Sequence, residues 1–173
     1  MRRATVCGLL STALFLATRS GDAKVARTDL ADLVKDSDFI GIVRVADVSS
    51  AIPMIRQRRA TATVLQSWKG QRDGEISFLA EPTWACDISD AEPGEEAVLF
   101  VRGDRLVLAG RGRMPIFLRA GRRLAAIWSE VILPADLATE DGPKSEYEFI
   151  RGVSVERLGA VVARLSVDSP VPK

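Results

Sequence analysis

The feature that most constrains the fold of this chain is a series of short apolar or alternating runs, separated by glycine, proline and aspartate. The runs lie at residues 39–48, 59–67, 75–79, 97–101, 105–109, 116–118 and 124–132. In the second run, Ala60, Ala62 and Val64 alternate with threonines, which is the period of a half-buried β-strand. Turn-forming residues at 70–74 and 103–104 predict two β-hairpins. The pattern therefore predicts a mainly β protein of six or seven short strands.

Two segments have helical periodicity, one near each end of the run of strands. The first covers residues 28–35, with Thr28 as its cap, and the second begins at Ser154. In the second segment the spacing i, i+3, i+4, i+7 forms an apolar stripe of Leu158, Val161, Val162 and Leu165. Residues 134–144 are predicted to be a loop. This arrangement favours a small barrel with helices packed on it.

The first 23 residues have the three zones of an export signal. Arg2 and Arg3 are followed by an apolar run at 6–17 and by Gly21-Asp22-Ala23, which places small residues where a signal peptidase cleaves. The run is shorter than the ~20 residues that span a bilayer, so cleavage is favoured over a membrane anchor. We expect a signal peptide at 1–23 and one exported domain at 24–173, periplasmic or extracellular. Its core would cover about 28–115 and a C-terminal extension 116–173, with no stable membrane span after cleavage.

The composition excludes several kinds of chemistry. The chain has no histidine, so Ser-His-Asp catalysis, Cys-His catalysis and His-ligated zinc are all excluded. Cleavage changes the 24 basic and 23 acidic residues to 21 and 22, a net charge of −1, so nucleic acid is not an expected partner. The densest carboxylate group, Asp87, Asp90, Glu92, Glu95 and Glu96, does not match a calcium-binding loop. We expect no catalytic residue, cofactor or metal.

Cys86 is the only cysteine that remains after cleavage, so no internal disulfide can form in the mature chain. Three roles stay open for its thiol: a buried structural position, a reactive thiol, or a disulfide with another chain. Burial is favoured, because cysteine outside disulfides is among the most buried residue types.

Three segments in order resemble the bacterial members of the tissue-inhibitor-of-metalloproteinases family, the netrin-like OB-fold modules. They are SDFIGIV at 37–43, ATVLQSWKG at 62–70, and Cys86 followed by GEEAVLF at 94–100. The resemblance covers about residues 29–109 and implies a five-stranded Greek-key barrel of the OB type. In the animal inhibitors an N-terminal cysteine binds the protease zinc, whereas this mature chain would begin with Lys24-Val25-Ala26. The resemblance therefore implies the fold and does not imply inhibition.

Trp68, Lys69 and Gly70 form the most distinctive part of this resemblance, and two interpretations of them are open. Trp68 could be an exposed platform for a sugar or a protein, with Lys69 supplying charge. The favoured interpretation is structural. Trp68 would close one end of the barrel on the Ala62/Val64 face, Lys69 would be solvated, and Gly70 would supply a backbone angle that other residues resist.

Arginines gather in predicted loops and strand ends, and they are the candidate binding residues. They are Arg56, Arg58, Arg59, Arg111, Arg113, Arg119, Arg122 and Arg123. Gathered at one rim, they could bind an anionic polymer or lipid head groups; ordinary salt-bridged loops are the favoured alternative.

The leading hypothesis is a non-catalytic, exported module that binds an envelope or secreted protein. The alternative is an anionic-ligand binder that uses the arginine-rich loops, and a carboxylate- or thiol-dependent enzyme is a third.

Overall fold

The computed structural model describes residues 25–52, 55–83, 86–144 and 149–167, with side chains outside the description at 50–52, 55–57, 144 and 149–150. The predicted signal peptide at 1–23 lies outside the described residues. The elements in chain order are β1 (Thr28–Asp29), α1 (Leu30–Asp36), β2 (Phe39–Ile52), β3 (Ile55–Lys69), β4 (Glu75–Leu79), β5 (Glu96–Arg102), β6 (Arg105–Leu106), β7 (Arg113–Arg119), β8 (Arg122–Ile127), β9 (Val131–Ile132), β10 (Glu140–Lys144), β11 (Phe149–Ser154) and α2 (Val155–Val167).

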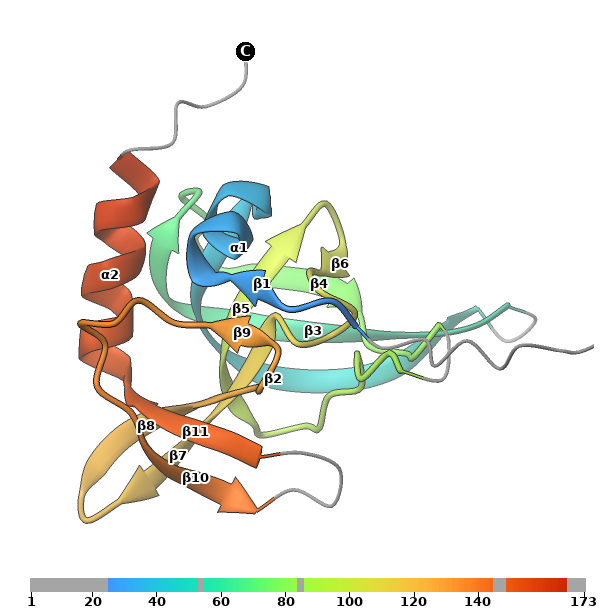
Figure 1. Ribbon diagram of the computed structural model, residues 1–173. Helices are drawn as coiled ribbons and strands as arrows, with labels where there is room; N and C mark the ends of the chain where they lie inside the picture. Colours follow the sequence, from blue (N-terminus) through green and yellow to red (C-terminus); the bar gives the residue numbers. More distant parts are fainter. Residues whose placement is uncertain (1–24, 53–54, 84–85, 145–148, 168–173) are drawn as a thin grey trace, which may run out of the picture.

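The chain is mainly β, with 49% strand and 16% helix, which confirms the predicted fold class. Eight strands follow one another in the main sheet in the order β10-β11-β8-β7-β5-β2-β3-β4, β6 pairs with β5, and β1 and β9 form a separate parallel pair. The predicted hairpins β3–β4 and β5–β6 are both antiparallel pairs. The sheet is not closed, so a barrel is not confirmed. Figure 1 shows the two helices against the sheet, with α2 standing at one side.

Strand β5 and the first part of β2, residues 39–43, are buried on both faces, which explains why their sequences are almost continuously apolar. In β2, Phe39 and Val43 pack in one hydrophobic cluster, whereas Ile40 and Ile42 pack in a second cluster on the opposite face. Register between β2 and β3 shifts at Ile40/Gly41, and an interior glycine often marks such an irregularity in a strand. Burial on both faces makes this pair the centre of the molecule.

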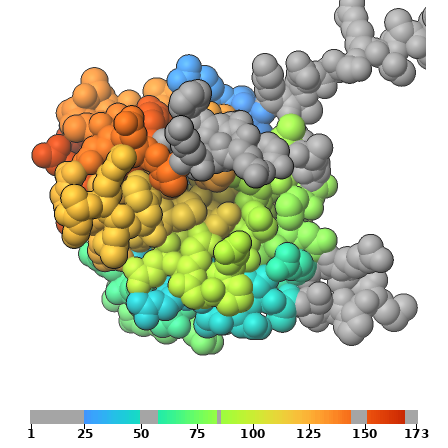
Figure 2. Space-filling view, turned by 90° about the horizontal axis from the view of Figure 1, so that it is seen from below, coloured from blue at the N-terminus to red at the C-terminus, as the bar shows by residue number. Residues whose placement is uncertain are grey.

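The two hydrophobic clusters divide the fold into layers. One cluster lies between the sheet and both helices, and it contains Leu30 and Leu33 of α1 and Leu158 and Val162 of α2. The other lies among β2, β3, β4, β5 and β6 and is centred on Phe39 and other fully buried side chains. The C-terminal strands β7–β11 continue the same sheet, and Figure 2 shows residues of β7–β11 (yellow to orange) directly against the green residues of the β4–β5 region.

Several predicted boundaries are wrong, each for a physical reason. The segment predicted as a loop at 134–144 contains β10, an edge strand that pairs only with β11 and therefore tolerates Pro143. The run 105–109 is a strand only at Arg105–Leu106, because the chain turns at Leu108 and Ala109, which both have positive φ. The predicted cap Thr28 belongs to β1, and α1 begins after Asp29. Ser154 does cap α2, since its hydroxyl accepts a hydrogen bond from the backbone of Arg157.

No helix in the described part of the chain is both long enough and apolar enough to cross a membrane.

Candidate functional site

The end of β3 changes direction at Leu65, and this determines where Trp68 points. Val43 pairs with Val64 and Ile42 pairs with Gln66, so Leu65 is an additional residue on β3, a β-bulge. One additional residue moves the side chains that follow it, up to the next register shift before Lys69, to the opposite face, because strand side chains alternate with a period of two. Val64 accordingly packs against the cluster between the strands, whereas Trp68 packs against the cluster under the helices.

The prediction that Trp68 shares a face with Ala62 and Val64 is therefore wrong. A Cβ at Gly159 of α2 would lie only 2.9–3.2 Å from three atoms of the indole, which places the helix backbone directly over one ring face. Trp68 is half-buried and packs against the hydrophobic cluster beneath the helices. The structural interpretation of Trp68 is supported by this packing, but its contact is with α2.

Lys69 is not the solvated residue that the sequence suggested. Its ammonium donates hydrogen bonds to the carbonyls of Val34 (2.5 Å) and Lys35 (3.4 Å), in the last turn of α1. A cation at this end of a helix interacts favourably with the helix dipole and satisfies carbonyls that lack helical partners. Desolvation lowers the pKa of Lys69 despite the nearby carboxylates of Asp38 and Asp36, which act in the opposite direction. Lys69 thus attaches α1 to the end of β3.

Glycine is required at position 70 for two reasons, the backbone angle and the close approach of neighbouring atoms. It has φ +65, and a Cβ at this position would lie 2.0 Å from the carbonyl oxygen of Asp38. The carboxylate of Asp38 also accepts a hydrogen bond from the backbone N–H of Gly103, in the turn between β5 and β6, at 2.7 Å. Two of the segments that carry the family resemblance, one at Asp38 and one at Gly70, therefore meet at one corner, together with the hairpin turn that follows the third segment.

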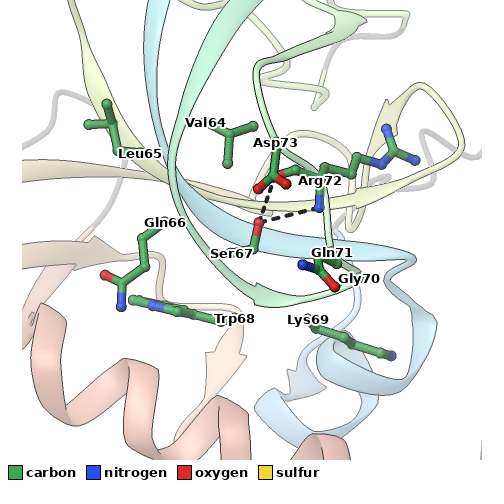
Figure 3. Close-up of a pocket in the computed structure, with 10 residues that line it drawn as sticks. All are labelled: Val64, Leu65, Gln66, Ser67, Trp68, Lys69, Gly70, Gln71, Arg72 and Asp73. Atoms are coloured by element: carbon green, nitrogen blue, oxygen red, sulfur yellow. Dashed lines mark hydrogen bonds between the residues drawn. The ribbon is translucent and has the colours of Figure 1, made fainter.

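Next to this corner the surface has an open groove of about 510 Å³, lined by residues 64–73 (Figure 3). One side of the groove is the last part of β3 and the other is the loop that returns toward β4. The hydroxyl of Ser67 joins the two sides by donating to the carbonyl of Arg72 at 2.9 Å. Leu65 is 46% exposed, and the guanidinium of Arg72 lies 5.8 Å from the centroid of the Phe39 ring. Apart from the Trp68-Lys69-Gly70 motif at its end, no pattern in the sequence indicates this groove.

Most of the candidate arginines pair with carboxylates of the same chain. Arg59 pairs with Asp104 at 2.8 Å, Arg113 with Glu95 at 2.5 Å, Arg122 with Glu140 at 2.7 Å and Arg123 with Glu96 at 2.9 Å. Arg119 donates to the backbone carbonyl of Asp141. Arg58 is exposed, and the side chain of Arg56 lies outside the described residues.

Arg111 differs from the other arginines because it is buried. Its Nε donates to Glu130 at 2.5 Å, with only 7% of the arginine side chain and 10% of the glutamate side chain exposed. Nη1 of the same guanidinium donates to the carbonyls of Cys86 (2.7 Å) and Ala109 (3.3 Å). Arg111 therefore has a structural role, joining three segments that are distant in sequence.

Cys86 is partly exposed, so the favoured expectation that it is buried is not met. Its backbone carbonyl accepts a hydrogen bond from Arg111.

Among the carboxylates near Cys86, Asp87 and Glu96 lie in separate contacts, whereas Asp90 and Glu95 share the guanidinium of Arg113. Asp87 accepts four hydrogen bonds, from the backbone and hydroxyl of Thr83 and of Ser89. Burial alone would raise the pKa of Asp87, but these hydrogen bonds together hold the pKa below its ordinary value. A hydrogen bond from Arg44, with a further contribution from Arg123, lowers the pKa of Glu96. Among the described residues, no three cysteine or carboxylate side chains are placed to hold a metal ion together.

Comparison of the chain with protein-family models, with curated proteins and with solved structures finds no match.

Proposed function

We propose that this chain is an exported, non-catalytic module that binds another protein. The observation that carries the proposal is the groove at residues 64–73, which combines an exposed leucine with a strand end that extends beyond its neighbour β4. Exposed apolar side chains next to unpaired strand edges are typical of surfaces that bind polypeptides.

The contacts of the candidate residues weigh against the other ligand classes. A polyanion would compete with existing partners of Arg59, Arg113, Arg122 and Arg123, because each of them pairs with a carboxylate of the same chain. A sugar that stacks on Trp68 would lose one ring face, since Gly159 of α2 covers it. Asp87 and Glu96 lie in separate hydrogen-bonded contacts, and Asp90 and Glu95 are both paired with Arg113, so neither arrangement favours a paired-carboxylate enzyme.

The proposal includes the OB-like, netrin-like assignment of strands β2 to β6. The N–H of Leu79 in β4 donates to the carbonyl of Asp104, next to β6, at 2.8 Å. This hydrogen bond brings the two ends of the unit together and supports a rolled sheet, as an OB-type fold requires. The family itself implies no particular partner, because OB-type folds carry many unrelated functions.

The test is covalent crosslinking of the affinity-tagged chain in the native envelope and in the culture medium, followed by binding of the purified captured protein. We expect one protein to be recovered in stoichiometric amounts and to bind the purified mature chain, with little dependence on salt. A chain that captures no protein but is retained on heparin or on phosphatidylglycerol vesicles at low salt would contradict the proposal and favour the anionic-ligand alternative.

A further inference from the structure

The outer side of β3 from Leu65 to Lys69 is a strand edge without a neighbouring strand. Pairing between β3 and β4 ends at Thr63 and Glu75, and the last described backbone hydrogen bond joins the N–H of Val64 to the carbonyl of Gly74 at 2.8 Å. On its other side β3 remains paired with β2 as far as Lys69. In a strand that is paired on one side only, the backbone groups that its neighbour does not use face the other side, so we expect those of this segment to be available to an added strand.

This edge has a β-bulge at Leu65, but it lacks the prolines and outward-facing charges that protect many strand edges. At the opposite end of the sheet, β10 has the sequence EDGPK, so charges and a proline discourage pairing with another chain. The segment 65–69, LQSWK, contains no proline. Its single charge, on Lys69, is turned toward the carbonyls of α1 and away from an approaching strand. The two ends of the sheet thus differ in whether they resist an added strand.

The lining of the groove indicates the chemistry of the segment that would bind there. Gln66, Ser67 and Gln71 contribute amide and hydroxyl groups to the lining. Arg72 and Asp73, which are neighbours in the sequence, contribute charges of opposite sign. These groups match an uncharged peptide, which presents alternating donors and acceptors. Leu65, 46% exposed at the bulge, would be covered by an aliphatic side chain of that peptide.

We infer that the edge at Leu65–Lys69 binds an extended, uncharged segment of the partner protein as an added β-strand, with an aliphatic residue over Leu65. This inference rests on the proposed function. A second copy of this chain fits the edge less well. Each copy has its own loop 70–73, held in place by Ser67, and pairing of the two edges would bring this loop into the groove of the other copy. A segment without such a loop meets no such obstacle.

The experiment uses the full mature chain and a displayed library of random linear peptides. A selected peptide is then synthesised in two forms, N-methylated at alternate backbone positions. An added strand uses every second N–H of the peptide, so one form should bind at least about tenfold more weakly and the other should keep its affinity. Equal effects of the two forms, or selection of charged peptides only, would overturn the inference.

The matched variants are Leu65→Lys and Leu118→Lys, since Leu118 is also exposed (73%) but lies in β7, away from the groove. Leu65→Lys should lower the affinity for the selected peptide at least about tenfold, and Leu118→Lys should leave this affinity unchanged. If Leu65→Lys does not fold, slower amide hydrogen exchange at 65–69 in the wild-type complex tests the same contact. A natural partner that is captured but insensitive to Leu65→Lys would overturn this inference and leave the proposed function intact.

Discussion

The turn after β3, at Trp68-Lys69-Gly70, and the turn after β6, at Leu108-Ala109-Gly110, are both tight but are held in different ways. The first has one residue with positive φ, and that residue is glycine. The second has three in succession, with φ values of 52, 48 and 83, and two of them are leucine and alanine. Non-glycine residues in this region cost about 1–2 kcal/mol each, so the second turn is strained and depends on outside support.

The supports of the two turns also differ in kind. At the first turn, Lys69 and Trp68 hold the two helices against the end of β3. At the second, the buried guanidinium of Arg111 joins the turn to Glu130 and to the carbonyl of Cys86, while Ile88 N–H donates to the carbonyl of Ala109 at 3.1 Å. The difference shows that a turn built on glycine can be stable locally, whereas a strained turn needs a buried network.

Removal of the buried pair should have the largest effect, because it leaves Glu130 without the guanidinium that neutralises it. We expect Arg111→Met to lower the free energy of unfolding by about 3–5 kcal/mol, measured by urea denaturation. The double variant Arg111→Met/Glu130→Leu should recover part of the loss. Arg122→Met, at an exposed pair, is the control and should change stability by less than about 1 kcal/mol. A loss at Arg111 no larger than at Arg122 would refute the dependence of the second turn on this network.

The first turn is tested at Gly70, with Gly74 as a matched control. Both glycines have positive φ, but a Cβ at Gly70 would lie 2.0 Å from the Asp38 carbonyl oxygen, whereas a Cβ at Gly74 meets nothing within 4 Å. We expect Gly70→Ala to cost about 3 kcal/mol or more and Gly74→Ala about 1 kcal/mol in thermal or urea unfolding. Equal costs would mean that the backbone angle alone, and not the contact with Asp38, makes glycine necessary.

The same contrast explains which parts of the fold could be predicted from the sequence. The strands from β2 to β8, both hairpins and the C-terminal helix follow from local patterns, and Gly70 is recognisable because glycine tolerates a left-handed backbone. Nothing in the local sequence indicates that Leu108 and Ala109 adopt positive φ, because their conformation depends on Arg111 and on distant segments. The run 105–109 was therefore predicted as a strand.

The candidate site was predictable only in part, for a related reason. The motif at Trp68-Lys69-Gly70 drew attention to the correct end of β3, but the bulge at Leu65 reverses which face Trp68 occupies. A strict alternation cannot reveal an additional residue, because the bulge is defined by pairing with β2. The sequence shows where the arginines are, but it does not predict their partners, because these lie far along the chain, up to 45 residues away for Arg59 and Asp104.

Acid should weaken the second turn before the first, because the second turn packs on the segment at residues 86–91. Asp87 holds that segment, and its pKa in the folded chain lies below the ordinary value found in the unfolded chain. The carboxylate therefore stabilises the fold above the unfolded pKa, and this contribution is lost as the pH falls through the folded pKa.

Between about pH 5 and pH 2, the free energy of unfolding should fall further for the wild-type chain than for Asp87→Asn. We expect the difference between the two losses to be about 1 kcal/mol, measured by urea denaturation at each pH. The protection factors for amide exchange, which correct for the slower intrinsic exchange in acid, should fall at residues 86–91 before they fall at residues 67–70. Parallel pH profiles of the two chains would contradict the role of Asp87.

The smallest expected effect is a gain in stability at the second turn. Ala109 has φ +48, and replacing it with glycine removes the strain of a side chain in this conformation. Glycine also increases the entropy of the unfolded chain, so the net gain should be modest, about 0.5–1 kcal/mol. Ala125→Gly, in the interior of β8 where the chain is buried and extended, is the control and should lower stability. If Ala109→Gly is also destabilising, the turn is not strained at this residue, and the buried network around Arg111 then serves to position segment 86–91 and not to offset backbone strain.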